Sequence, residues 1–192
     1  AKLSKGTVHM VPTDTDITSA PQAQRNYMGY VPKDRDNEAL MIHANIRDNV
    51  VMPSMRELTG GIGFLNPPKL ARLANDTRTS LSVKSTGILQ PMDALSGGNK
   101  QKVNLGRWLA KDLKLLILDC PTRGVDVGVK AYIYSLMKEA KTKGIAMILI
   151  SDELTEVLGM ADRLFVMKNG RIKKEIRRDE DFTEQSVIGV MI

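Results

Sequence analysis

The sequence predicts an α/β fold, with a parallel sheet covered by helices on both faces and a smaller, mostly helical insertion. Two short and continuous apolar runs, at 115–118 and 145–150, are typical of buried parallel strands. A helical pattern begins between them, near Val129, and its apolar face is formed by Ile133, Leu136, Met137 and Ala140. Because strands alternate with helices here, the pattern favours a parallel sheet over an antiparallel one.

The remainder of the second half predicts further elements in sequence order. A short helix is expected from Glu153, followed by a strand at 163–167. The tripeptide Lys168-Asn169-Gly170 is typical of a hairpin turn, and it predicts a partner strand at 171–176. Residues 183–192 have the pattern of a terminal helix with one apolar face.

The first half is less regular. Short strands are expected at 7–11 and 28–31. From 44 to 94 the pattern loosens, and the pairs Gly60-Gly61 and Pro67-Pro68 interrupt it. We therefore expect residues 44–94 to form the helical insertion.

Composition excludes several classes of protein. The chain has 192 residues, 42% of them hydrophobic, and a net charge of +6 from 28 basic and 22 acidic side chains. This mix is globular, and the apolar runs are far shorter than the roughly 20 residues that a membrane helix needs. The single cysteine, Cys120, excludes an internal disulfide framework. Basic residues are interleaved with acids and aromatics make up only 4%, so nucleic acid is not expected as a partner.

The sharpest motif is Leu95-Ser96-Gly97-Gly98-Asn99-Lys100-Gln101, directly before a helical pattern. Glycines let the backbone approach a ligand closely, and the start of a helix offers free N–H groups and a positive dipole end. The Ser96 hydroxyl could add a further donor. The motif therefore suits a phosphate group, although a plain turn with an N-cap explains a bare Ser-Gly-Gly equally well.

The second motif is an apolar strand that ends in Asp119, followed by Cys120-Pro121-Thr122. Such a strand places a carboxylate at the carboxyl edge of a parallel sheet, where ligands bind and where an aspartate often holds Mg²⁺ through water. A tight loop, Arg123 to Gly128, comes next. An aspartate at a strand end is a weak signal when it stands alone.

Together, and in this order, the motifs resemble the signature motif, Walker B strand and D-loop of an ABC-transporter ATPase. Three further segments resemble the second cassette of the tandem sugar-import ATPases of the ribose, galactose and xylose class: 30–35, 123–130 and 150–154. The resemblance implies that residues 1–192 are part of one such cassette with a RecA-like P-loop NTPase core. It places the core at 1–43 and 95–192, with a helical subdomain at 44–94.

The resemblance also implies a role for each matching position. Ser96, Gly97, Gly98 and Asn99 would contact the γ-phosphate of an ATP molecule that an opposing cassette holds. The other positions would act in four further roles: Asp119 in the Mg²⁺ shell, Asp126 in the D-loop, Lys33 at the Q-loop position and Asp152 at the switch position.

Three departures from the family pattern predict a degenerate cassette. No Gly-x-x-x-x-Gly-Lys-Ser/Thr loop occurs in the sequence, so we expect a chain that begins after this loop and is inactive alone. Cys120 stands where hydrolysing cassettes have a glutamate, and a thiol with a pKa near 8.5 is mostly protonated at pH 7. Lys33 and Asp152 replace the family's glutamine and histidine.

The resemblance implies partners as well: a second ABC cassette, in tandem or as a homodimer, and transmembrane permease subunits. It places the protein at the cytoplasmic face of the inner membrane as a peripheral subunit with ATP and Mg²⁺ as cofactors. The rival hypothesis is a non-catalytic structural or regulatory module that uses the same scaffold only for pairing. The missing phosphate loop and Cys120 favour the rival, whereas the complete 95–101 motif favours the transporter.

Overall fold

The computed structural model describes residues 5–59, 64–180 and 182–191. Contacts within the chain divide it into two compact units, Ala1–Ile148 and Leu149–Ile192. Each unit is described by itself below. This division falls at 148/149, whereas the predicted boundaries between the core and the helical subdomain fall at 43/44 and 94/95. Those boundaries therefore stay predictions.

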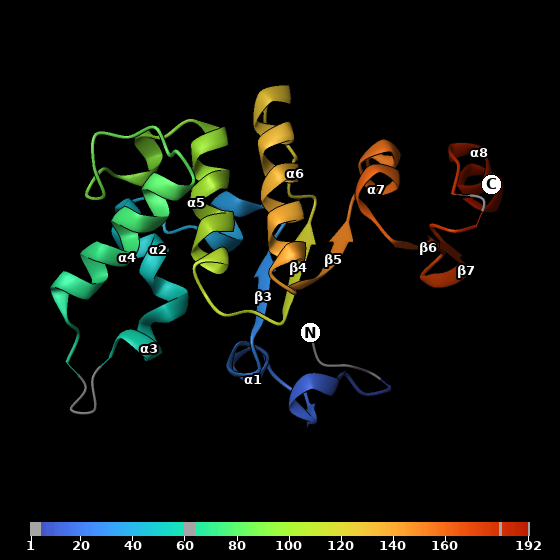
Figure 1. Ribbon diagram of the computed structural model, residues 1–192, viewed down its shortest axis with the longest axis horizontal. Coiled ribbons are helices and arrows are strands. Elements are labelled where there is room, and N and C mark those ends of the chain that lie inside the picture. The colour runs from blue at the N-terminus through green and yellow to red at the C-terminus, as the bar shows by residue number, and fades with distance from the viewer. Residues whose placement is uncertain (1–4, 60–63, 181, 192) are drawn as a thin grey trace. The chain divides into compact units, whose positions relative to one another are not determined.

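A three-stranded sheet has the strand order β3-β4-β5, and its strands β3 and β4 lie in the first unit (Figure 1). Strand β3 (Met28–Val31) runs parallel to β4 (Leu115–Asp119), with Val31 opposite Leu118. Strand β5 spans Ala146–Ile150. Val31, Leu116 and Leu118 are fully buried, as expected for apolar strands that form a core. The predicted strands at 28–31, 115–118 and 145–150 are therefore confirmed.

Two long helices accompany this sheet. Helix α5 (Gly97–Leu109) packs on β3 and on the first turns of α6 (Val127–Thr142). The closeness of α5 to the sheet depends on Gly29, where an added Cβ would lie 2.9 Å from the Leu116 side chain and 3.0 Å from Trp108. Helix α6 begins two residues earlier than the sequence predicts, because the Asp126 side chain accepts a hydrogen bond from the Val129 amide at 2.9 Å.

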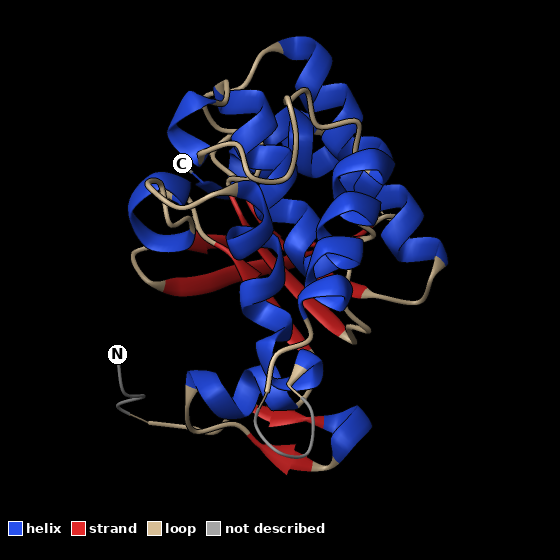
Figure 2. Ribbon diagram, turned by 90° about the vertical axis from the view of Figure 1, so that its left-hand side faces the viewer, coloured by secondary structure: helices blue, strands red, loops and turns tan. Residues whose placement is uncertain are grey.

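The described residues of 44–94 are mostly helical, as predicted. They contain α2 (Ile46–Val51), the 3₁₀ turn η3 (Met52–Ser54), α3 (Met55–Leu58), α4 (Pro67–Ser80) and the 3₁₀ turn η4 (Met92–Ala94). Figure 2 views the molecule from the side of α2 and α4, where helices form the near layer. Helices α4 and α5 meet at Gly106, where an added Cβ would lie only 2.1 Å from Leu81 Cδ1.

The first residues form smaller elements than the sequence predicts. In place of a strand over 7–11, a two-residue strand β1 (His9–Met10) pairs antiparallel with β2 (Thr15–Asp16) around the 3₁₀ turn η1 (Val11–Thr13). The short helix α1 (Ala20–Arg25) then leads into β3. After β3 the chain forms a π-helical turn, η2 (Arg35–Ala39), whose N-terminus is capped by the Asp34 side chain.

The second unit contains the predicted hairpin and terminal helix. Helix α7 (Leu154–Met160) precedes β6 (Arg163–Lys168), which pairs antiparallel with β7 (Arg171–Arg177), and α8 (Glu184–Met191) follows. Asn169 and Gly170 have φ values of 51° and 72°, as a tight turn between twisted strands requires. Val166, Ile176 and Val187 form the core of this unit.

Strand β5 corrects one expectation. A sheet covered on both faces would bury every apolar side chain of this strand, yet Ile148 and Ile150 are each 49% exposed. The elements of the described residues therefore leave one face of β5 open to solvent. A search of the same residues finds no helix long and apolar enough to span a membrane.

Candidate functional site

The candidate site lies at the carboxyl edge of the sheet, where β3 and β4 end side by side. Asp119 is the last residue of β4, and Lys33 follows β3 by two residues. The Tyr30 side chain lies near the half-buried Asp119 carboxylate. Desolvation raises the pKa of Tyr30 above its ordinary value of 10.0, and the negative charges of Asp119 and Glu38 raise it further. Tyr30 therefore stays a neutral phenol beside Asp119.

Cys120 follows Asp119 in an unusual backbone conformation. Its φ is 46°, in the left-handed region that side chains other than glycine rarely adopt, and the residue is only 8% exposed. The Cys120 carbonyl accepts a hydrogen bond from the Arg123 amide at 3.1 Å, which closes a turn over Pro121 and Thr122. The thiol is thus buried at the point where the chain leaves the sheet, in agreement with its interpretation as a small core residue.

The 95–101 motif opens helix α5, with its glycines as the first two helical residues. The Ser96 hydroxyl is the N-cap and accepts from the Asn99 amide at 3.4 Å and from Asn99 Nδ2 at 2.9 Å. The Asn99 side chain also accepts from the Lys84 amide at 3.0 Å. Because the first N–H groups of a helix have no partner within the helix, the amides of Gly97 and Gly98 are the ones directed out of its end.

A side chain would be crowded at both positions of the Gly97-Gly98 pair, and more severely at Gly98. An added Cβ at Gly98 would lie 2.8 Å from Val129 Cγ2, at the start of α6. At Gly97 it would lie 3.0 Å from Arg35 Nη2. Ser96 is exposed and the two glycines are half-buried, so the end of the helix is accessible.

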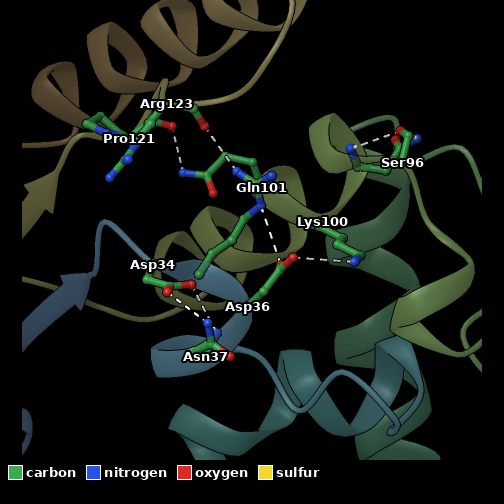
Figure 3. A network of polar contacts seen from close by, with 10 residues as sticks. Asp34, Asp36, Asn37, Ser96, Lys100, Gln101, Pro121 and Arg123 are labelled. Atoms are coloured by element: carbon green, nitrogen blue, oxygen red, sulfur yellow. Dashed lines mark hydrogen bonds and ion pairs between the residues drawn. The ribbon is translucent and has the colours of Figure 1, made fainter.

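A network of polar contacts joins this helix end to the loop after β4, as Figure 3 shows. Gln101 Nε2 donates to the Pro121 carbonyl at 2.6 Å, and Arg35 Nη1 donates to the Arg123 carbonyl at 3.1 Å. Asp36 lies 3.6 Å from Arg35 Nε and 3.6 Å from Lys100 Nζ. These contacts could not be predicted from the sequence, because they depend on the tertiary fold.

Asp126 and Asp152 lie in different units of the chain. Asp126 is exposed and caps α6 at the end of the loop that follows Cys120. Asp152 is also exposed and lies in the second unit, between β5 and α7. There, the neighbouring Ser151 hydroxyl donates to the buried Glu156 carboxylate, which the sequence analysis missed. The roles of Asp126 and Asp152 stay predictions.

The residues of the first unit fit a phosphate group and a hydrated cation. The open end of α5 presents two glycine amides and the positive end of its dipole, with the cations Lys100 and Arg35 nearby. Asp119 is a carboxylate that a hydrated Mg²⁺ could contact. The described part of the chain contains no group of three or more His, Cys, Asp or Glu side chains that could bind a metal directly, so the protein would hold such an ion through water and phosphate oxygens.

Helix α5 begins with two glycines, and it lies near a parallel strand that ends in an aspartate. This arrangement is typical of an ATP-binding cassette. The family described as "ABC transporter" matches residues 1–123, and the chain belongs to this family. It is similar to two curated ribose import ATP-binding proteins. One, from Mesorhizobium japonicum, is 42% identical over 84% of this chain, and the other, from Caldanaerobacter subterraneus, is 38% identical over 97% of it. The chain spans only 31% and 38% of their respective lengths.

Solved structures confirm the predicted fold class. A dimeric ATP-binding cassette bound to ADP and Pi has a TM-score of 0.77 and 18% identity, with 92% of this chain and 75% of that chain covered. A second cassette in an ADP conformation has a TM-score of 0.74 and 22% identity, over 99% and 78% of the two chains. The prediction of an ABC cassette with a RecA-like parallel sheet and helices is therefore correct.

Proposed function

We propose that this chain is part of the energy-coupling ATPase subunit of a bacterial sugar-type ABC importer. In this proposal, Ser96, Gly97, Gly98 and Asn99 face the γ-phosphate of an ATP molecule that a second cassette holds. The observation that carries the proposal is the accessible end of α5, where neither glycine could be replaced without a shift of Val129 or Arg35. The similarity to ribose import ATP-binding proteins supports the sugar-type class of transporter.

The proposed chemistry is transfer of the γ-phosphoryl group from ATP to water. Mg²⁺, when bound, would neutralise charge on the phosphate oxygens. The amides of Gly97 and Gly98 would stabilise negative charge that develops on the γ-phosphate, because a helix end holds these dipoles in place before the reaction. These amides would act on the ATP that the partner cassette holds, whereas Asp119 would contribute to the Mg²⁺ shell of the chain's own, separate site.

We further propose that the chain's own ATP site is degenerate. The buried Cys120 thiol cannot orient an attacking water as a carboxylate does. Lys33 offers a positive charge without the geometry of an amide, and Asp152 would add repulsion near a phosphate. The chain alone is therefore expected to be inactive, while its signature segment serves the partner's site.

As partners we propose a second cassette and transmembrane permease subunits, with the assembly at the cytoplasmic face of the inner membrane. The alternative, a non-catalytic module that uses the scaffold only for pairing, is favoured by the buried thiol at position 120. The two proposals differ in whether the end of α5 affects ATP turnover.

Hydrolysis by the full-length tandem protein tests the degenerate site. With the Walker B glutamate of the first cassette replaced by glutamine and Cys120 intact, we expect ATP turnover to fall by about 100-fold or more, the usual contribution of a general base. Steady-state phosphate release measures this, and Cys120→Ser in an otherwise unchanged protein serves as the control, with turnover near that of the parent. Robust turnover that survives loss of the first cassette's glutamate would show that the site with Cys120 hydrolyses ATP.

A further inference from the structure

Arg35 lies where three segments of the first unit meet. Its Nη1 donates to the Arg123 carbonyl at 3.1 Å, across 88 positions of sequence. Its Nη2 lies 3.0 Å from the position that a Cβ on Gly97 would occupy. Its Nε faces the Asp36 carboxylate at 3.6 Å, within its own π-helical turn. One planar guanidinium thus joins the turn after β3 to the loop after β4, and it fills the space beside the first residue of α5.

The turn that carries Arg35 is held at its N-terminal end. Asp34 caps it by accepting from the Asn37 amide at 3.2 Å and from Asn37 Nδ2 at 2.8 Å. Asp36 also lies 3.6 Å from Lys100 Nζ, on the first turn of α5. The Arg35 and Lys100 side chains are 18% and 15% exposed, so water screens these charges only in part. These contacts fix the backbone from which the Arg35 side chain extends.

The loop whose Arg123 carbonyl accepts the hydrogen bond from Arg35 has a backbone conformation that needs support from its surroundings. It begins with Cys120, whose φ of 46° lies in the left-handed region that residues with a side chain rarely adopt. Conformations of this kind persist only where surrounding contacts hold them. From outside the loop, Arg35 donates to the Arg123 carbonyl, and the 3% exposed Gln101 donates to the Pro121 carbonyl. Gln101 belongs to α5, and Arg35 lies beside Gly97, the first residue of that helix. Both hydrogen bonds therefore hold the loop near the start of α5.

We propose that Arg35 is a positioning residue that fixes the loop at 121–126 against the first turn of α5. It contacts no nucleotide itself. It sets the position of Asp126 relative to Gly97 and Gly98, the groups that would face the partner's ATP. The consequence for turnover rests on the proposed function, whereas the consequence for the loop does not.

Arginine is required here for its shape as well as its charge. A lysine could pair with Asp36, but it lacks the planar fork that reaches the Arg123 carbonyl and covers Gly97 at the same time. Arg35→Lys should therefore behave like Arg35→Gln. If the side chain acted only as a partner for the Asp36 charge, the lysine variant would behave like the parent.

The test uses the full-length protein in its assembled state and compares Arg35→Gln, Arg35→Lys and the control Arg25→Gln. Arg25 is an exposed arginine on α1, outside the network. We expect amide hydrogen exchange at 120–126 to become at least about tenfold faster in both Arg35 variants, while exchange in β4 and α6 stays within about twofold of the parent. We also expect kcat for ATP hydrolysis to fall about tenfold with KM changed by less than about threefold. The control should match the parent in each measurement.

Three outcomes would overturn the proposal: unchanged exchange at 120–126, recovery of parental exchange and kcat in Arg35→Lys, or faster exchange throughout the first unit. A loosened loop with unchanged kcat would overturn the link to turnover. Failure of the proposed function can be told apart from failure of the Arg35 proposal. If the proposed function is wrong, ATP turnover will also be insensitive to Gly98→Asp. In that event, a locally loosened loop would still support the role of Arg35 in holding it.

Discussion

Replacing Gly98 by aspartate should lower ATP turnover by the assembled protein about 100-fold or more, the range seen when a stabilising donor is lost from a catalytic site. The substitution places a carboxylate where the proposed site faces a γ-phosphate. It also adds a Cβ that would lie 2.8 Å from Val129 Cγ2, which forces the first turns of α5 and α6 apart. Phosphate release at saturating ATP measures the effect.

Gly87→Asp is the matched control for this variant. Gly87 lies in the same unit, and an added Cβ there meets nothing within 4 Å. Gly98→Ala separates charge from size, because it adds the Cβ without the carboxylate and should reduce turnover less than Gly98→Asp does. Parental turnover in Gly98→Asp would remove the basis for the transporter proposal and would favour the non-catalytic module.

Gly106→Val should destabilise the first unit by about 2–3 kcal/mol, at the upper end of the usual cost of overpacking a core. An added Cβ at Gly106 would lie 2.1 Å from Leu81 Cδ1 and 2.9 Å from Thr77 Cγ2, so α4 and α5 could not keep their distance. Urea unfolding of the chain, followed by the fluorescence of Trp108, its single tryptophan, measures the change.

Two further variants make this prediction specific. Gly87→Val, at an open position of the same unit, should change stability by less than about 0.5 kcal/mol. Leu81→Ala removes the side chain that Gly106→Val would meet, so the double variant should be more stable than the sum of the two single effects predicts. Simple additivity would show that the two helices do not depend on contact at Gly106.

The elements that sequence analysis predicted well are those set by local patterns. The strand at 115–118 was predictable from its apolar run, and the turn at Asn169-Gly170 from residues that accept positive φ. The short strand β1 was predicted too long, because nothing in 7–11 indicates that the chain turns back after two paired residues. Burial of β5 on both faces was wrong, because an apolar run does not report which neighbours cover it.

In the candidate site, too, local motifs were predicted and contacts made by the tertiary fold were missed. Motif spacing identified Ser96, Gly97, Gly98 and Asp119, and the structure brings β3, β4 and the start of α5 into one region of the first unit. The Ser96 hydroxyl accepts hydrogen bonds from Asn99 as an N-cap, and its role as a phosphate donor stays a prediction. Arg35 and Gln101 were missed, because their acceptors are main-chain carbonyls distant in sequence, which no side-chain pattern records.

The most direct measurement of the central claim is the structure of the assembled protein trapped with ATP and Mg²⁺ in its closed state. The account predicts that the Gly98 nitrogen lies about 3 Å, a hydrogen-bond distance, from a γ-phosphate oxygen of a nucleotide whose other phosphates the second cassette holds. A closed assembly in which residues 96–99 face solvent or protein, away from every bound nucleotide, would contradict it.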